Sequence, residues 1–552
     1  MMNRLQKILP GTCVILTILI IVHFITLVTR HAVNLPIWDD FDSILWFMNL
    51  YNDAPTVSEK LLLVYKQHNE HRIIVNKVLS LLDYWVFSEV NFAHLIYASS
   101  AALIALAVIL GSKSKEILVT ILISCAVLLQ PQYGDGLNWV TTSVASFFLT
   151  LFALLCSFLA YQSKIKYYYL LPLTALACFS QGNGILVPYC IALYFLLEKR
   201  WFPAFCIFLF GALTCYLYFL GYTTPQHTQN ISELYGNIPH LLDYGFTIVG
   251  ASLGFSNKIA SLSCGVVLTL LFLFVLSIPK LRKNSPLIPF LLFLFLSAAI
   301  NTAARGMSST DFAISPGRYT ILSSGIVAAL AIIFFQYLSL RESVLRYIFI
   351  PAALVFNFYS YHYYFNAVEN LYVKTINDLA GHALTDMGLT YPWPDRGVPL
   401  YRESEAKGIY SLPYAELGLQ ERTTLDSSGF LTVKNNMRLN INRVQSGKEH
   451  FVIEGWAFIK SCSSNDTDTF INLVSASETI AIKALKKPRT DVEGHFKSNK
   501  YHNSGYISVF PKTWLKTGEK YNYQVVMICG ELKYKQKTRY MISTEVVDLK
   551  LD

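Results

Sequence analysis

Two adjacent carboxylates follow the first long hydrophobic segment of the chain, where Asp39 and Asp40 lie within the sequence Trp-Asp-Asp-Phe-Asp. A carboxylate at a membrane boundary is costly to desolvate, so paired carboxylates there are candidates for general acid–base chemistry. The alternative is that these acids only decorate the outer end of a helix. The sequence does not indicate which of the two would act as the base.

A second polar cluster, Gln-His-Asn-Glu-His-Arg, spans residues 67–72. Two histidines and a glutamate this close are possible metal ligands, but His68 and His71 do not have the four-residue spacing of a helical two-histidine zinc motif. No distant third ligand is evident, so we expect no metal site. We predict instead that His68, Glu70, His71 and Arg72 hydrogen-bond sugar hydroxyls or a phosphate. The alternative is a solvated surface turn.

Two arginines next to hydrophobic segments form a third cluster, with Arg305 followed further along the chain by Arg318 and Tyr319. An arginine stays charged and donates two parallel hydrogen bonds, which suits a phosphate or pyrophosphate at a membrane interface. The alternative is that these side chains snorkel to the interface or contact lipid headgroups.

The composition indicates a membrane protein, so membrane helices must hold these three clusters in position. Of the 552 residues, 53% are hydrophobic and 15% are charged. Many apolar runs have about 20 residues, the length that crosses the hydrocarbon core as a helix. The predicted fold class is a polytopic α-helical membrane protein. We expect about eleven transmembrane helices, at residues 8–29, 92–111, 116–131, 140–162, 166–180, 184–198, 201–221, 259–278, 286–304, 319–338 and 347–365.

Basic residues mark one side of this topology, because Lys and Arg cluster in alternate connections. The clusters lie at residues 4–7, 113–115, 164–166, 199–200, 280–283 and 341–346. By the positive-inside rule this side is cytoplasmic, so we predict the N-terminus inside and the C-terminus outside. The first span lacks a small-x-small exit and is expected to stay as an anchor. Since the net charge of +9 is spread over these connections, we expect no nucleic-acid partner.

The connections on the outer side are unequal. The first one, residues 30–91, is long and contains two segments with apolar residues at helical spacing, around residues 59–65 and 75–82. Neither segment is long enough to cross a bilayer, so we predict amphipathic helices at the membrane surface. Residues 238–255 are predicted to form another interfacial or re-entrant segment.

Three parts follow one another along the chain. Residues 1–365 form the transmembrane domain, 366–427 a connector and 428–552 a C-terminal domain. In the last part, short alternating apolar segments between turn residues predict an antiparallel β-sandwich outside the membrane. Its two cysteines, Cys462 and Cys529, are expected to form a disulfide in an oxidising compartment.

The arrangement of residues 1–365 resembles the GT-C glycosyltransferases, which use polyprenyl-phosphate sugars. The acidic pair after the first span, the long first outer loop and the interfacial helices carry this resemblance. Within that superfamily, Trp38-Asp39-Asp40, the strip at 68–72 and Arg318-Tyr319 look like those of bacterial integral-membrane transferases that modify O-antigen. The serotype-converting glucosyltransferases are the most similar group.

The resemblance implies inverting transfer of a monosaccharide, such as glucose, from a polyprenyl-phosphate donor to a lipid-linked O-antigen-type acceptor. The reaction would take place on the periplasmic face of a bacterial inner membrane, without a cofactor. Asp39 or Asp40 would be the base, Arg318 and Arg305 would hold the phosphate, and the strip at 68–72 would position donor or acceptor. The implied partners are the donor, the glycan acceptor, the bilayer, a donor-forming glycosyltransferase and a flippase.

Other function classes stay open from the sequence. An O-antigen polymerase or ligase would share the outer arginines and the lipid-linked substrate, but would join two polymeric substrates. A transporter of lipid-linked sugars would be expected to show intramembrane charges or repeats, and we find no convincing repeat. An outer sensor with a ligand-binding sandwich would leave the first-loop cluster unexplained.

Overall fold

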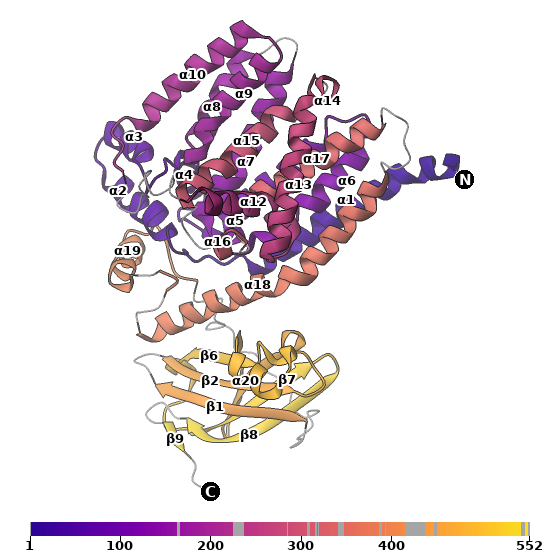
Figure 1. Cartoon of the computed structure of the whole chain (residues 1–552). Coiled ribbons are helices and arrows are strands. Elements are labelled where there is room, and N and C mark those ends of the chain that lie inside the picture. Colours follow the sequence, from indigo (N-terminus) through magenta and orange to yellow (C-terminus); the bar gives the residue numbers. More distant parts are fainter. Residues whose placement is uncertain are drawn as a thin grey trace. The chain divides into compact units, whose positions relative to one another are not determined.

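In the computed structural model the chain divides into two compact units (Figure 1). Unit 1 comprises Met1–Ala32, Asp39–Val368 and Ser404–Tyr410, and unit 2 comprises Val33–Trp38, Glu369–Glu403 and Ser411–Asp552. The structure describes residues 2–162, 166–224, 237–283, 285–305, 310–314, 317, 319–339, 347–385, 389–391, 393–413, 436–446, 450–542 and 547–549.

Unit 1 is a bundle of apolar helices. Within the described ranges, seven helices are long and apolar enough to cross a membrane. They are α1 (Met2–His31, apolar from Leu9), α5 (Phe92–Gly111), α7 (Val140–Tyr161), α10 (Trp201–Phe219), α13 (Lys258–Ser277), α15 (Ile288–Arg305) and α17 (Thr320–Ser339).

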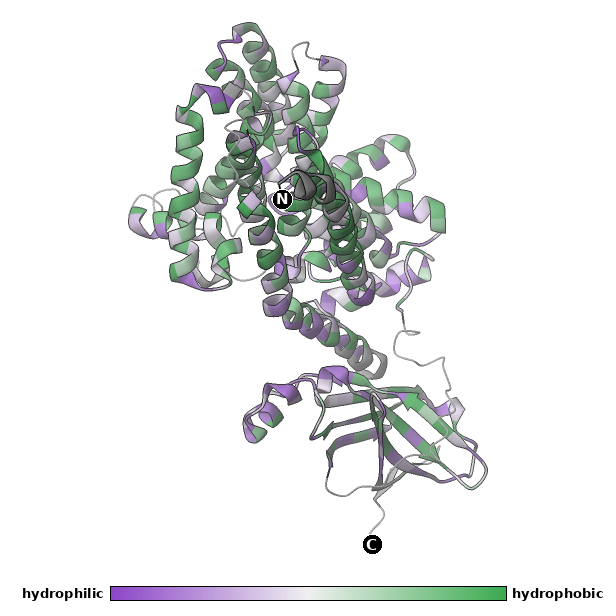
Figure 2. Cartoon of the chain, turned by 90° about the vertical axis from the view of Figure 1, so that its right-hand side faces the viewer, coloured by the Kyte–Doolittle hydropathy of each residue, from purple (hydrophilic) through white to green (hydrophobic). Residues whose placement is uncertain are grey.

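The helices of unit 1 consist mainly of hydrophobic residues (Figure 2), and many apolar side chains on them are exposed. On α10, Phe202 and Phe205 are 73% and 60% exposed, and on α1 Ile15 is 61% exposed. Contiguous apolar surface of this kind is normally covered by another apolar phase, here the lipid of a bilayer. The predicted helical membrane fold is therefore confirmed.

The predicted number of about eleven spans exceeds the seven helices that meet the length and composition expected of a crossing. All eleven predicted segments contain a helix, but α6 (Ile117–Leu128), α8 (Tyr167–Cys178) and α9 (Leu186–Leu197) have only 12 residues each. Such a helix is about 18 Å long, against a hydrocarbon core of about 30 Å. The eleventh, α18 (Phe349–Thr385), is long, but polar residues such as Asn357 interrupt its apolar sequence. The apolar runs in the sequence continue past the helix ends into turns. The sequence therefore predicts more spans than there are helices of sufficient length.

The first outer loop folds into four helical segments. These are η1 (Phe41–Trp46), α2 (Phe47–Asp53), α3 (Val57–Tyr65) and α4 (Ile74–Phe87). Helices α3 and α4 confirm the two helices predicted there. On α4 the polar Asn76 and Lys77 are buried, whereas Trp85 and Val86 are 63% and 70% exposed. This polarity is the one expected of a helix that turns its apolar face towards lipid.

A tight helix crossing follows in the second half of the bundle, between α12 (Ile238–Gly254) and α13. A side chain at Gly250 or Gly254 would collide with Ser261, and one at Gly265 would collide with the backbone of Phe246. Small residues at a helix interface allow this close backbone approach. The interfacial or re-entrant position predicted for residues 238–255 stays a prediction.

Buried amides fix the turn that leads into α7. Helix α6 ends at Leu128, and the carbonyls of Ala126 and Leu129 accept hydrogen bonds from Asn357 Nδ2 at 2.8 and 3.0 Å. The side-chain oxygen of Gln130 accepts from Ser360 Oγ at 2.5 Å. These bonds satisfy carbonyls that a helix end leaves unpaired. They also position the short η2 segment (Pro131–Leu137), after which α7 begins.

The C-terminal part of unit 2 consists of two antiparallel sheets with strand orders β1-β2-β6-β5 and β4-β3-β7-β8-β9. Inward-facing side chains of both sheets form one hydrophobic core, and Tyr506 and Tyr523 share a hydrogen bond of 2.6 Å within it. The strands are β1 (Met437–Ser446), β2 (His450–Ile459), β3 (Asp468–Val474), β4 (Thr479–Lys483), β5 (Leu485–Lys487), β6 (Gly505–Pro511), β7 (Tyr521–Cys529), β8 (Leu532–Ile542) and β9 (Val547–Leu549).

The predicted disulfide is confirmed, since Cys462 and Cys529 are bonded across a sequence separation of 67 residues. Closing a loop of this length stabilises the folded state by about 4 kcal/mol, because the crosslink restricts the unfolded chain. We expect the double substitution Cys462→Ser, Cys529→Ser to lower the melting temperature of the β-rich part by at least about 10 °C.

Differential scanning calorimetry of the detergent-solubilised protein, with and without reductant, measures this change. The reductant should shift the wild-type transition and leave the double variant unaffected. A Cys206→Ser, Cys264→Ser protein is the matched control, because these half-buried cysteines are free. Equal melting of the two double variants would contradict a stabilising role of the disulfide.

Candidate functional site

One cavity of unit 1 collects most of the residues singled out from the sequence. It has a volume of about 330 Å³, and we call it the Asp39 cavity. Six of the nine predicted site residues line it, namely Asp39, His68, Glu70, His71, Arg305 and Tyr319. They come from the segment before η1, the turn between α3 and α4, the end of α15 and the start of α17. Of the remaining three, Asp40 and Arg72 lie elsewhere and Arg318 falls outside the described residues.

The two adjacent aspartates have different surroundings. Asp39 lines the cavity, whereas Asp40 is fully buried. The Asp40 carboxylate accepts hydrogen bonds from the backbone N–H groups of Thr141 and Val140 at 2.7 and 3.3 Å, and from the Thr141 hydroxyl at 2.5 Å. It therefore caps the N-terminus of α7, where unpaired N–H groups and the helix dipole favour a negative charge.

A tight turn presents the second cluster to the cavity. His68 and His71 exchange backbone hydrogen bonds of 2.8 and 2.9 Å, and Asn69 between them has a left-handed φ of 46°. Outside the turn, the hydroxyls of Tyr218 and Tyr222 donate to the carbonyl of Glu70 at 3.3 and 3.4 Å. The end of α10 therefore fixes the backbone from which Glu70 reaches the cavity.

An ion pair and a histidine define the charge in the cavity. Arg305 Nη2 lies 2.9 Å from Glu70 Oε1, and His71 Nε2 lies 3.7 Å from the same oxygen. The N–H of Gly182 donates to His71 Nδ1 at 3.2 Å. Because Nδ1 accepts this bond, the hydrogen-bond network assigns the ring proton to Nε2, on the side of Glu70.

Polar residues from other connections complete the wall. Gln181, Gly182 and Asn183 line the cavity, although the short connection that contains them gives only a weak signal in the sequence. A side chain at Gly182 would place its Cβ 2.9 Å from His71 Nδ1, so a larger residue there would force the imidazole to shift. Asn183 Nδ2 donates to Ser297 Oγ at 3.2 Å, while its Oδ1 is buried without a hydrogen-bond partner among the described residues.

Trp139, Thr141 and Asn301 also line the cavity and were not singled out from the sequence. Each lies at or near a helix end, next to an apolar run, where single polar or aromatic residues are common and carry no distinctive pattern. Only their position in the folded bundle connects them with Asp39.

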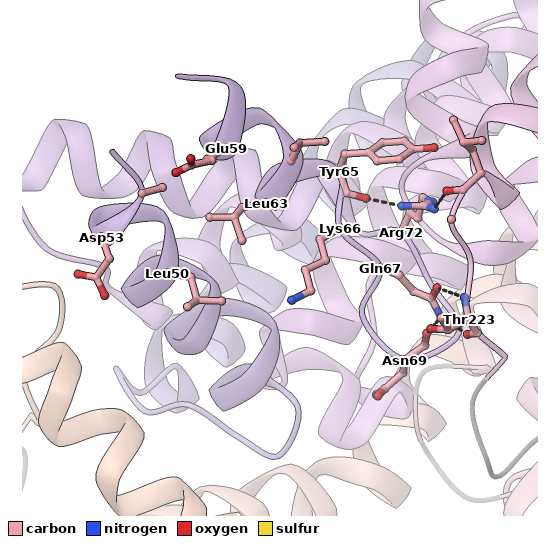
Figure 3. Close-up of a pocket in the computed structure, with 14 residues that line it drawn as sticks. Leu50, Asp53, Glu59, Leu63, Tyr65, Lys66, Gln67, Asn69, Arg72 and Thr223 are labelled. Atoms are coloured by element: carbon pink, nitrogen blue, oxygen red, sulfur yellow. Dashed lines mark hydrogen bonds between the residues drawn. The ribbon is translucent and has the colours of Figure 1, made fainter. Parts of the chain in front are cut away.

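Arg72 lies outside the Asp39 cavity and holds helix ends together (Figure 3). Its guanidinium donates to the carbonyls of Tyr65, Tyr218 and Leu220 at 2.5 to 2.6 Å and lies 4.0 Å from the Tyr65 ring centroid. The side chain is 2% exposed. These contacts join the ends of α3 and α10, so we leave Arg72 out of the substrate-binding set.

Lys77 is a second buried cation in this scaffold. Its Nζ donates to the carbonyls of Leu63 and Lys66 at 2.9 and 2.6 Å, and the side chain is 4% exposed. Burial, together with the positive charges of Lys66 and Arg72, lowers the pKa of Lys77 to about 7. The ammonium therefore loses its proton far more readily than that of an exposed lysine.

Comparisons with known proteins give no family for this chain: no family model, no curated protein and no solved structure matches it. Among the described residues, no group of three or more His, Cys, Asp and Glu side chains is arranged to hold a metal ion.

The contacts of Asp40 predict a structural role. Asp40→Ala leaves the N–H groups of Val140 and Thr141 without their acceptor, at a cost of about 2–3 kcal/mol. We expect a clear fall in the melting temperature of the detergent-solubilised protein, measured by fluorescence-detected gel filtration. Asp39→Ala is the matched control and should lower it much less. Equal losses in the two variants would argue against the cap.

The lowered pKa of Lys77 predicts a pH-dependent stability. Between pH 7 and about 10 the unfolded chain binds more protons at this lysine than the folded chain does, so stability rises with pH. From pH 7 to 9.5 this contribution is about 3 kcal/mol. Melting temperatures of wild type and Lys77→Met, measured across this range, isolate it by difference. A rise of the same size in Lys77→Met would assign the effect to other groups.

Proposed function

We propose that this protein is a membrane glycosyltransferase that moves a monosaccharide from a polyprenyl-phosphate donor to a glycan acceptor. One observation carries the proposal: the Asp39 cavity unites a carboxylate, two histidines, a Glu–Arg ion pair and a tyrosine from segments far apart in the sequence. Unlike charges and hydrogen-bonding groups around a small cavity suit a polar substrate with a phosphate group.

Asp39 is the proposed general base. Its carboxylate takes the proton of the acceptor hydroxyl while that oxygen attacks the anomeric carbon of the donor sugar. The bond between this carbon and the phosphate oxygen breaks in the same step, and polyprenyl phosphate leaves with the bonding electrons. A single displacement of this kind inverts the anomeric configuration. Asp40 is not a candidate, because its oxygens already cap α7.

Arg305 is the proposed partner of the phosphate. Its guanidinium forms the ion pair with Glu70 at 2.9 Å, which orients it and leaves further N–H donors for phosphate oxygens. His71 offers its Nε2 proton on the same side. Arg318 stays in the proposal as a second phosphate ligand, on its sequence position beside Tyr319.

Asn183 is the proposed contact for a sugar hydroxyl. Its unpartnered Oδ1 is an acceptor in the cavity wall, and a buried acceptor gains most when a ligand supplies the missing donor. A transporter would not need the base and the phosphate clamp to converge on one cavity. The arrangement therefore favours chemistry over passage.

The finer topology belongs to the same proposal. We infer a bacterial inner-membrane protein with about eleven crossings and a cytoplasmic N-terminus, in which the shorter apolar helices cross together with their neighbours. The Asp39 cavity would open to the periplasm, where a lipid-linked O-antigen-type glycan is the acceptor and glucose a suitable donor sugar. The two C-terminal sheets would form a periplasmic β-sandwich, in keeping with their disulfide. A donor-forming glycosyltransferase and a flippase would supply the substrate.

A reconstituted transfer assay tests this proposal. Purified protein in detergent receives a panel of polyprenyl-phosphate sugars and lipid-linked glycan acceptors, and mass spectrometry follows the released polyprenyl phosphate and the mass gain of the acceptor. We expect a gain of one hexose with one donor. Asp39→Asn should lower transfer at least 100-fold without loss of protein, because the amide cannot accept the proton. Arg305→Lys should mainly raise KM for the donor.

Two controls match these variants. Asp42→Asn removes a neighbouring carboxylate that does not line the cavity, and Arg282→Lys alters an arginine that pairs with Glu198 elsewhere in the bundle at 3.0 Å. Both should retain transfer. Near-normal activity of Asp39→Asn would reject the assigned base. Chain lengthening from two lipid-linked oligosaccharides, without single-sugar transfer, would instead identify a polymerase.

A further inference from the structure

A second and larger hollow in unit 1 is lined in part by Lys66, Gln67 and Asn69, next to the turn that carries Glu70 and His71 (Figure 3). It has a volume of about 910 Å³, and we call it the Lys66 pocket. Helices α2 and α3 and the chain that follows α10 form its walls. It shares only Asn69 with the lining of the Asp39 cavity. The lining residues are Leu50, Asp53, Ala54, Glu59, Leu62, Leu63, Tyr65, Lys66, Gln67, Asn69, Arg72, Leu220, Gly221 and Thr223.

One end of this pocket is positively charged. Lys66 and Arg72 line it, and the Lys77 ammonium donates to the Lys66 carbonyl directly behind it. The donors of Arg72 and Lys77 are directed to backbone carbonyls. The Lys66 side chain is exposed, with its Nζ 4.6 Å from the Trp46 ring centroid. Among the described residues it has neither an ion pair nor a hydrogen bond.

The acidic residues of the pocket do not neutralise this end. Asp53 forms an ion pair with Lys407 at 2.7 Å, and Glu59 lies in the first turn of α3, where the helix dipole stabilises a negative charge. In Figure 3 Asp53 and Glu59 lie on the left and Arg72 on the right, with Lys66 between them. An anion at Lys66 would therefore meet the positive charges of Lys66 and Arg72, while the nearest acidic residues of the lining are an aspartate paired with Lys407 and a glutamate at the start of α3.

The walls between the two ends are apolar. Leu50, Leu62, Leu63 and Leu220 line this part. Leu61 and Leu62 on α3 are 64% and 63% exposed, as expected for a helix at a bilayer surface. A hydrocarbon chain therefore has a continuous apolar path from the surface of α3 into the pocket.

We propose that the Lys66 pocket binds an anionic glycerophospholipid of the bilayer, with its phosphate on the Lys66 ammonium and an acyl chain along the leucines. The combination of an unpaired cation and an apolar wall matches a ligand that is both charged and hydrophobic. This proposal does not depend on the glycosyltransferase function. Because Gln67 and Asn69 line the pocket, the bound lipid would also brace the turn that presents Glu70 and His71.

Native mass spectrometry of the delipidated full-length protein tests this site. Dioleoyl phosphatidylglycerol, dioleoyl phosphatidylcholine and glycerol 3-phosphate are the three probes. We expect one retained phosphatidylglycerol, and about tenfold weaker retention in Lys66→Gln, the loss typical of one charge-assisted hydrogen bond. Lys66→Arg should retain the lipid. Lys60→Gln is the matched control, because Lys60 lies on the same helix, over the Tyr51 ring, outside the pocket.

Three results would overturn the proposal. Equal retention of phosphatidylcholine would remove the preference for an anionic headgroup, and displacement by equimolar glycerol 3-phosphate would show a site for free phosphate. A similar loss in Lys60→Gln would indicate general surface charge. A melting temperature within about 2 °C of wild type in Lys66→Gln, expected for an exposed side chain, excludes misfolding as the cause of lost binding.

Discussion

The contact between Asp40 and the start of α7 is the constraint on which the site depends. It joins residues about 100 positions apart, and it does so with a buried charge that is stabilised by N–H groups, a hydroxyl and the dipole of one helix end. A charge buried in this way has few alternative partners. The start of the outer loop is therefore held at one position on the bundle. This contact also fixes the position of the adjacent Asp39 in the cavity.

The same principle recurs with the opposite sign at helix C-termini. Arg72 and Lys77 direct their N–H groups to carbonyls at the ends of α3 and α10. The carbonyls at these helix ends, which would otherwise be hydrogen-bonded to water, accept hydrogen bonds from side chains instead. Some polar groups of the first outer loop thus hold short helices in place, and others line the cavity.

The sequence predicts much of the fold because long apolar runs are stable as helices in a bilayer and unfavourable in water. The positions of the helices and the cysteine pairing follow from residue types alone. The difference between Asp39 and Asp40 could not be predicted, because identical neighbours are distinguished only by a helix 100 residues away. Arg72 is predicted to bind substrate for the same reason: the residues next to it in the sequence do not indicate that its guanidinium donates to three backbone carbonyls. Gln181 and Asn183 give a weak signal in a short polar connection, and their approach to His71 depends on Gly182.

The glycine crossing of α12 and α13 has a consequence for how the chain enters the membrane. With Gly250, Gly254 and Gly265 in backbone contact, the two helices have almost no side-chain layer between them and cannot slide past each other. Helix α12, at 17 residues, is a poor candidate for independent insertion. Since α13 has the length and hydropathy of a membrane span, we expect the close hairpin of the two helices to enter the membrane as one unit.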